Sequence, residues 1–151
     1  MVNMSEKSTD LHDFIMNLCN SSFNGRAVFS LIEHELYYEY LLKPRNNEGS
    51  EINILLDKIE PIELFVSLGE SSTYIEYEAG NEFDRNMLVN LFDIAINGRL
   101  KEIKYFFFNY QIRLDSVVEN TDSPVVLIGY KSFFYYILPI TSVYEVNYKS
   151  W

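Results

Sequence analysis

Residues 62–78, IELFVSLGESSTYIEYE, decide the fold. The apolar residues between Ile62 and Leu68 extend over the length of one strand, and Gly69–Ser72 follow with the composition of a hairpin turn. Apolar and polar side chains then alternate, as in a strand with one buried and one solvated face: Thr73, Ile75 and Tyr77 share one side, and Tyr74, Glu76 and Glu78 share the other. The stretch therefore predicts an antiparallel hairpin.

The chain before this hairpin predicts further strands. Residues 27–35 are ambiguous between helix and strand, because their apolar residues follow no clean period. From His34 onward the pattern alternates, so we expect two strands within 27–42 and a tight turn near Glu33–Glu35. Residues 52–56 predict the next strand, after a loop over 43–50 that is rich in Pro, Asn, Gly and charge.

Two segments have the pattern of amphipathic helices. Leu11, Phe14, Ile15 and Leu18 recur at helical spacing and predict a helix over about 9–22, with Ser8 or Thr9 as its N-cap. Met87, Leu88, Leu91, Phe92 and Ala95 form the apolar stripe of a second helix over about 84–97, capped by Asp84 or Asn81. Gly98 is the expected C-terminal stop.

The C-terminal third predicts more strands. Residues 103–108 are apolar on both faces, which favours a strand covered on both sides. Residues 112–117 and 143–148 are further candidates, and 125–130 with 133–140 predict a hairpin around Lys131 and Ser132. We expect the aromatic residues here to lie mostly in the core, namely Phe106, Phe107, Phe108, Phe133, Phe134, Tyr135 and Tyr136.

These elements predict an α+β fold: a mainly antiparallel sheet with the two helices packed on it. We expect one domain over residues 1–151, with residues 1–8 flexible. The longest apolar run, 133–140, is too short to span a membrane. A polar N-terminus and a single cysteine, Cys19, indicate a cytoplasmic protein.

The net charge of −10 is concentrated in residues 30–84, which hold 13 acidic and 3 basic residues. Residues 101–151 carry 5 of each sign. This distribution argues against nucleic acid and anionic membranes as partners, because phosphate binding needs Lys and Arg. A basic protein is the natural electrostatic complement, although acidic residues also serve simply to keep an aromatic-rich domain soluble.

No motif for catalysis, cofactor binding or metal binding is found in the sequence. His12 and Cys19 lie seven residues apart on one helix, whereas a helical zinc pair needs a spacing of three or four. Glu33 with Glu35, and Glu76 with Glu78, lie about 6.5–7 Å apart if each pair alternates along a strand. Such pairs suit cation binding or acid–base chemistry, but alternating Glu is also the ordinary solvated face of an antiparallel strand. We therefore expect a protein that is not an enzyme.

Two segments are similar to parts of several families of immunity proteins from bacterial toxin systems, including contact-dependent growth inhibition. One is Leu64–Glu78, with its Gly-Glu-Ser-Ser turn and Tyr-Ile-Glu-Tyr-Glu strand. The other is residues 95–100, Ala-Ile-Asn-Gly-Arg-Leu, where a helix ends at Gly and a strand begins. The small, acidic, aromatic-rich chain resembles this class as a whole. The resemblance implies a protein that binds and neutralises a cognate toxin domain, often a nuclease with a basic cleft.

An acidic surface that contains tyrosines is the predicted contact for such a partner, because tyrosine combines an apolar body with a polar tip. Its members are Glu33, Glu35, Tyr37, Glu39, Glu70, Tyr74, Glu76, Glu78, Glu82 and Asp84. Two alternatives stay open. One is a small enzyme that uses a Glu pair and His34, whose side chains should then converge in a pocket. The other is a structural or regulatory module that self-associates through an exposed sheet edge.

Overall fold

A computed structural model describes residues 6–22, 25–76, 82–119 and 127–151. The first part of the chain forms a helix, five strands and a second helix: α1 (Glu6–Ser22), β1 (Ala27–Glu33), β2 (Tyr37–Pro44), β3 (Ile52–Asp57), β4 (Glu63–Leu68), β5 (Ser71–Glu76) and α2 (Glu82–Ile96). The second part adds β6 (Leu100–Phe107), β7 (Tyr110–Val118), a 3₁₀ turn η1 (Phe133–Tyr136) and β8 (Ser142–Asn147). The predicted α+β class is confirmed.

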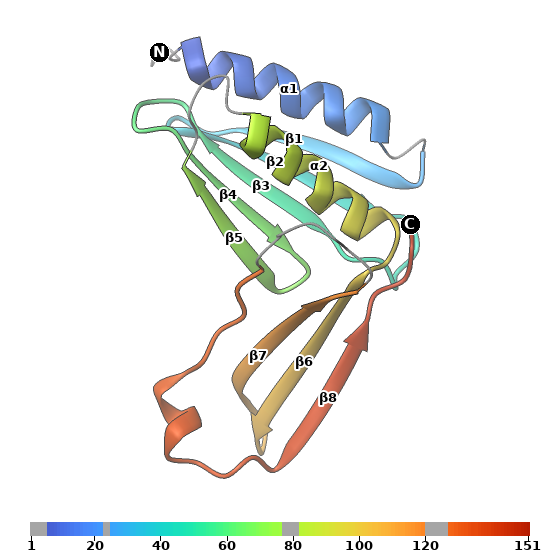
Figure 1. Cartoon of the computed structure of the whole chain (residues 1–151), viewed down its shortest axis with the longest axis vertical. Coiled ribbons are helices and arrows are strands. Elements are labelled where there is room, and N and C mark those ends of the chain that lie inside the picture. The colour runs from blue at the N-terminus through green and yellow to red at the C-terminus, as the bar shows by residue number, and fades with distance from the viewer. Residues whose placement is uncertain (1–5, 23–24, 77–81, 120–126) are drawn as a thin grey trace.

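The first five strands form one antiparallel sheet in the order β1-β2-β3-β4-β5. Each strand pairs with the next along the chain, and residues 69–70 form the turn of the predicted β4–β5 hairpin. Residues 27–35 are therefore strand and turn, and the two strands expected within 27–42 are present. Both helices lie on the same side of this sheet, and its other side faces away from them (Figure 1).

The core lies between the helices and this sheet. Alternate residues of the central strands are buried there, such as Tyr40 and Leu42 in β2 and Ile52 and Ile54 in β3. The helices contribute their apolar stripes, including Leu11, Ile15, Cys19, Leu88, Leu91 and Phe92. Burial raises the pKa of the Cys19 thiol to about 12, so the thiol is protonated and behaves as a small apolar group.

The caps predicted at Ser8 or Thr9 and at Asp84 are wrong, whereas the alternative cap at Asn81 is not tested. Helix α1 begins at Glu6, so Ser8 and Thr9 lie inside it; Ser8 is fully buried and its Oγ donates to the Asp57 carbonyl at 2.8 Å. Of the segment expected to be flexible, residues 6–8 thus belong to the helix, and residues 1–5 lie outside the described residues. Asp84 lies within α2, and Asn81 is also outside the described residues. Gly98 ends α2 in the left-handed conformation, at φ +62°.

The remaining strands form a second antiparallel sheet in the order β7-β6-β8. It extends away from the helices, and its far end holds the β6–β7 hairpin and η1 (Figure 1). The chain then returns to the first part of the molecule, where the Trp151 indole donates to the Ser50 carbonyl at 3.0 Å. Neither helix in the described part of the chain combines the length and hydropathy needed to cross a membrane.

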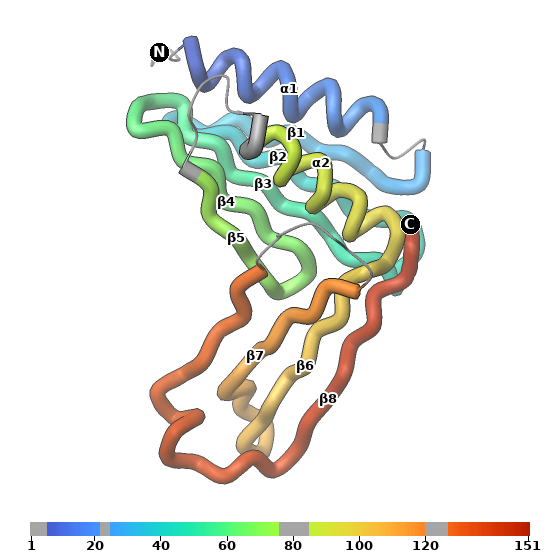
Figure 2. The backbone as a smooth tube through the Cα atoms, in the orientation of Figure 1, coloured from blue at the N-terminus to red at the C-terminus, as the bar shows by residue number. Residues whose placement is uncertain are grey.

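A segment that we call the strap, residues 127–132, links the edges of the two sheets. Ile128 exchanges two backbone hydrogen bonds with Ser72 of β5, at 2.7 and 3.2 Å. Farther along, Leu114 of β7 donates to the Tyr130 carbonyl at 2.8 Å. Figure 2 shows this segment passing from beside β5 toward the far end of the second sheet. Gly129 permits the close approach, because a Cβ there would overlap the Leu114 carbonyl.

A buried carboxylate, Glu102 of β6, lies where the two sheets meet. It is fully buried, and its oxygens accept hydrogen bonds from the Glu70 backbone N–H (2.8 Å), the Ser71 hydroxyl (2.7 Å) and the Tyr148 hydroxyl (2.8 Å). Burial, followed by the bond to Glu102, raises the pKa of Tyr148 and keeps it a donor. Three donors from two separate segments, the β4–β5 hairpin and the chain after β8, therefore satisfy one buried charge.

Three expectations for the C-terminal third are wrong. The strand expected to be covered on both sides, 103–108, is central in its sheet, but its residues are half-buried or exposed. Residues 133–140 form no strand, because Phe133–Tyr136 close a 3₁₀ turn in which the Tyr135 N–H donates to the Ser132 carbonyl. Of its expected partner strand, 127–130 belong to the strap, and 125–126 lie outside the described residues. The aromatic residues of this third are also not core: Phe108, Phe133, Phe134 and Tyr136 are exposed, and Phe106, Phe107 and Tyr135 are only half-buried.

Candidate functional site

The open face of the five-stranded sheet is the side that neither helix covers. Strand alternation places every second residue here, and cross-strand register sorts these residues into rows. The row at one end holds Tyr37, Asp57 and Glu63. The middle row holds Ile32, Glu39, Leu55, Phe65 and Tyr74. The face thus combines carboxylates, tyrosines and half-exposed apolar groups.

Two carboxylates lie side by side in the end row. Asp57 is the last residue of β3 and Glu63 is the first residue of β4. Because Leu56 pairs with Leu64 across these strands, the adjacent residues of the two strands, Asp57 and Glu63, also lie opposite each other. Burial raises the pKa of the Asp57 carboxyl, and the like charge of Glu63 raises it further. No ion pair with Lys or Arg joins either one among the described residues. A basic group from outside the chain would relieve this repulsion.

The neighbouring lysine does not compensate Asp57, because it points to the opposite side of the sheet. Lys58 is 5% exposed, and its Nζ donates to Glu33 at 2.8 Å and to the His34 carbonyl at 2.5 Å. Its charge lowers the pKa of Glu33 through that hydrogen bond. The Lys58 ammonium is therefore bonded on the helix-covered side. It does not offset the negative charge of Asp57 on the open face.

The middle row supplies the apolar part of the face. The rings of Phe65 and Tyr74 meet edge to face, with centroids 6.0 Å apart. The Tyr74 hydroxyl donates to the Glu63 carboxylate and so connects this row to the acidic end. Glu39 accepts from Asn53 Nδ2 at 3.1 Å and lies 3.2 Å from His34 Nε2. Such a mixture of aromatic and carboxylate groups is suited to contact with a protein surface.

The structure brings together three of the predicted contact residues and separates the others. Tyr37, Glu39 and Tyr74 share the open face. Glu33 is on the helix-covered side, and Glu35 lies in the β1–β2 turn, so these two do not form an alternating strand pair. The Glu pair predicted there is therefore wrong.

Glu70 is at the opposite end of the sheet from the acidic row. It lies in the β4–β5 turn, where Lys104 and Gln111 of the second sheet donate to its carboxylate. The bond from Lys104 lowers its pKa. For the remaining predicted residues, Glu76 pairs in register with Glu63, but its side chain and those of Glu82 and Asp84 are not described, and Glu78 lies outside the described residues.

Sequence reasoning missed Asp57, Glu63, Leu55 and Phe65. The signal was present, because residues 52–57 and 62–68 alternate and the short loop between them fixes an antiparallel register. Extending the alternation across both strands would have placed all four beside Tyr74. Instead, the acidic residues were selected by their density in the sequence.

The enzyme alternative required a Glu pair to converge with His34 in a pocket. His34 stacks on Tyr37, with ring centroids 4.2 Å apart, and its ring nitrogen meets one carboxylate, Glu39. His12 lies 2.6 Å from the Tyr40 hydroxyl, while Cys19 is in the core. Within the described ranges, no three His, Cys, Asp or Glu side chains are grouped as metal ligands would be.

Comparisons with known proteins add no relative to this picture. No protein-family model matches the chain, and neither curated proteins nor solved structures give a match. The class defined by the fold is therefore an α+β protein with an uncovered, acidic sheet face.

Proposed function

We propose that this protein binds another protein through the open face, and that it acts as an immunity protein toward a toxin domain. The observation that carries the proposal is the pair Asp57 and Glu63, two adjacent carboxylates on the open face that no Lys or Arg of the described residues pairs with. Proteins tolerate such repulsion where a site needs it. A basic partner group gains a favourable interaction with both carboxylates at once.

A nuclease toxin suits this face best. Its cleft is basic because it binds phosphates, so carboxylates can occupy the positions that phosphates would take. Long-range attraction to a chain of net charge −10 would speed the encounter and weaken with added salt. Phe65, Tyr74 and Leu55 would then provide the apolar contacts that hold the complex together.

The test begins by sequencing the genes beside the one for this chain, and it uses any nuclease-type toxin domain found there. Wild-type protein should bind the purified domain and protect cells that express it. The double variant Asp57→Lys, Glu63→Lys should lose at least tenfold in affinity, because attraction becomes repulsion at the acidic end row of the face. Glu60→Lys is the matched control, since Glu60 is exposed in the β3–β4 loop and faces only Lys7.

Two failures can be told apart. If the wild-type chain neither binds nor protects, the immunity function is wrong. If the double variant binds as well as the Glu60→Lys control, the function stands but the open face is not the contact surface.

A further inference from the structure

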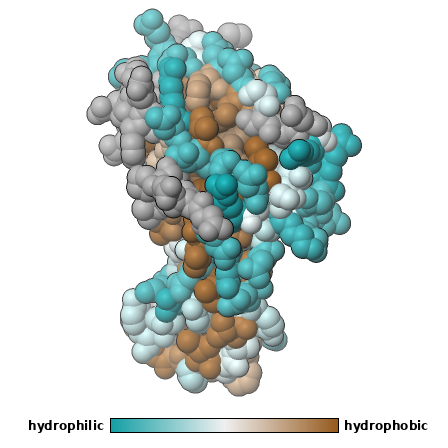
Figure 3. Space-filling view, turned by 45° about the vertical axis from the view of Figure 1, so that its right-hand side comes forward, coloured by the Kyte–Doolittle hydropathy of each residue, from teal (hydrophilic) through white to brown (hydrophobic). Residues whose placement is uncertain are grey.

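The far end of the second sheet is an uncharged aromatic surface that the proposed function does not use. We call it the tip: residues 107–112, which end the β6–β7 hairpin, and residues 132–141, which include η1. Neither segment contains Asp, Glu, Lys or Arg. Figure 3 shows mostly brown and pale side chains at this lower end, whereas strongly hydrophilic ones concentrate on the upper body.

The exposed apolar area of the tip is large for a monomer. Five aromatic side chains are between 56% and 75% exposed, namely Phe108, Tyr110, Phe133, Phe134 and Tyr136. At about 200 Å² for a fully exposed aromatic side chain, they present on the order of 700 Å². Ile137 and Ile140 are exposed beside them and bring the area near the roughly 800 Å² that each partner buries in a stable interface.

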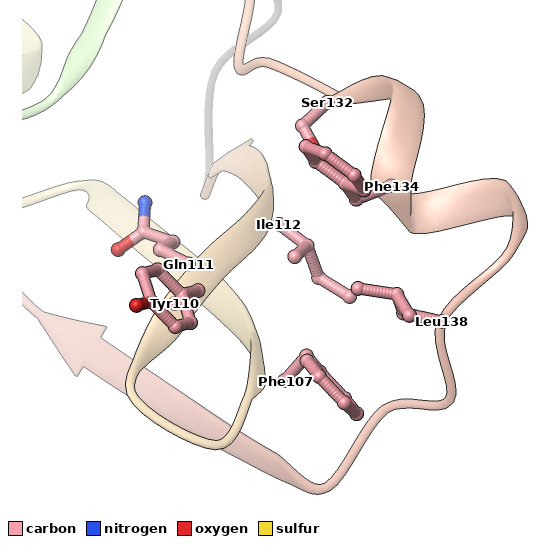
Figure 4. Close-up of a pocket in the computed structure, with 7 residues that line it drawn as sticks. All are labelled: Phe107, Tyr110, Gln111, Ile112, Ser132, Phe134 and Leu138. Atoms are coloured by element: carbon pink, nitrogen blue, oxygen red, sulfur yellow. The ribbon is translucent and has the colours of Figure 1, made fainter.

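The tip also contains a pocket that such side chains could fill. It has a volume of about 370 Å³ and lies between the β6–β7 hairpin and η1, lined by Phe107, Tyr110, Gln111, Ile112, Ser132, Phe134 and Leu138 (Figure 4). Protruding rings and a pocket that accepts a ring therefore occur in one patch. A surface of this kind can meet its own copy across a two-fold axis, because each copy offers both halves of the contact.

The hairpin loop holds one of these rings in a strained conformation. Phe108 has a φ of +50° in a two-residue loop, where glycine or asparagine would be free of strain. Its N–H donates to Thr141 Oγ1 at 2.7 Å, which fixes the loop against the chain that leads into β8. Strained backbone positions that present an exposed side chain are concentrated at functional sites.

The distribution of charge favours a second copy of this chain as the partner that binds the tip. Of the net charge of −10, the whole excess is in residues 30–84, and most of the helices and five-stranded sheet lies at the other end of the molecule from the tip (Figure 1). The exception is Glu70, which accepts from Gln111 of the tip and is paired with Lys104. Two copies that meet tip to tip bring no acidic side chains of the tip together and keep the acidic bodies far apart. Contact through the open faces would instead oppose like charges.

We infer that the tip joins two copies of this chain in a symmetric dimer, with an aromatic side chain of each copy inserted in the other's pocket. The dimer leaves both open faces accessible. The inference is independent of the proposed function, since it rests on different residues.

Sedimentation velocity of the full chain tests the dimer. At about 50 μM, an interface of this size should give a species of twice the 17.8 kDa chain mass. Phe133→Asp and, as a milder change, Tyr136→Ser should each shift the protein to monomer with an unchanged circular dichroism spectrum, because both side chains are exposed. Val89→Asp is the control: Val89 is exposed on α2, far from the tip, and this variant should remain dimeric.

Three results would overturn the inference. One is a monomeric wild-type chain at this concentration, and another is a dimer that persists in both tip variants. The third is a monomer that cosediments with phosphatidylcholine vesicles and loses this binding in Phe133→Asp, which would make the tip a lipid contact.

Discussion

Replacing the buried carboxylate at the junction of the two sheets should destabilise the whole fold. Glu102→Gln keeps the shape of the side chain but removes its charge. The three donors that surround it, from Glu70, Ser71 and Tyr148, would then face a neutral amide with one acceptor oxygen in place of two. Because Glu102 is fully buried, water cannot take over the lost bonds.

The size of the effect follows from the number of bonds. A hydrogen bond to a charged group contributes about 1.5–3 kcal/mol, and a neutral one about 0.5–1.5 kcal/mol, so each bond should lose about 1 kcal/mol. Together the three weaker bonds lower the stability of the folded state by about 3 kcal/mol. Part of this loss is offset, because burying a neutral amide costs less free energy than burying a carboxylate. We expect the free energy of unfolding to fall by about 2 kcal/mol.

Urea denaturation followed by far-UV circular dichroism measures this loss. Glu145→Gln is the matched control, since it makes the same chemical change at an exposed carboxylate of β8 that pairs with Lys101. Surface ion pairs of this type contribute about 0–1 kcal/mol. If Glu102→Gln unfolds at the same urea concentration as Glu145→Gln, the buried network does not hold the two sheets together and the reasoning is wrong.

Three other changes give expected outcomes. Phe108→Gly should raise the midpoint of thermal unfolding, because it removes left-handed strain of about 1–2 kcal/mol, while sedimentation velocity shows a weaker dimer; a lower midpoint would contradict the strain. Asp57→Asn should stabilise the protein at neutral pH. The folded pKa of Asp57 is raised, so the native state binds the proton more tightly and the contribution of Asp57 to stability falls as pH rises through the range above about 4. Urea titrations at pH 4 and 7 should therefore show the variant gaining stability relative to wild type between the two pH values, and an unchanged difference would refute the reasoning. Gly129→Ala should cost about 1–3 kcal/mol by overpacking against Leu114, and hydrogen exchange should then show loss of protection at the Leu114 and Ser132 amides, which donate across this contact, rather than in α1.

Strands β2, β3 and β4 could be predicted because their residues alternate, whereas β1 has no clean period and is buried at one position only. In β3 and β4 every second residue is buried and the others are half-exposed, so sequence period and structure agree. The turns are equally readable: Gly69 and Gly98 adopt positive φ where the chain must reverse or end a helix. The first residue of each helix was less predictable, because Ser8 was read as a cap when its hydroxyl bonds to a neighbouring strand instead.

The candidate site was only partly predictable. Tyr37, Glu39 and Tyr74 were found because they alternate with buried residues. The count of acidic residues could not show that Glu33 and Glu70 form ion pairs, since their partners, Lys58 just after β3 and Lys104 in β6, are distant in sequence. Only the strand register in the folded structure shows which carboxylates have a basic partner and which do not.

The tip was misread for a related reason. An apolar run such as 133–140 indicates that the side chains avoid water, but it does not say whether the chain itself covers them. Within the described residues neither α1 nor α2 lies against the second sheet, and Phe133 and Tyr136 stay exposed although each meets a neighbouring ring of η1. An aromatic segment without a helical or strand period can therefore indicate a surface that contacts another molecule, and not only a buried core.

The strap holds the two sheets in a fixed arrangement and so determines how two binding faces can be presented in a dimer. With Ile128 bonded to β5 and Tyr130 to β7, the two sheets are fixed at one angle, so the tip and the open face keep a constant separation and direction. In a tip-to-tip dimer the two open faces would sit at the ends of a stiff spacer. One small partner could not bridge them, whereas two partner domains in a single assembly at the matching distance would be bound with the advantage of a high effective concentration.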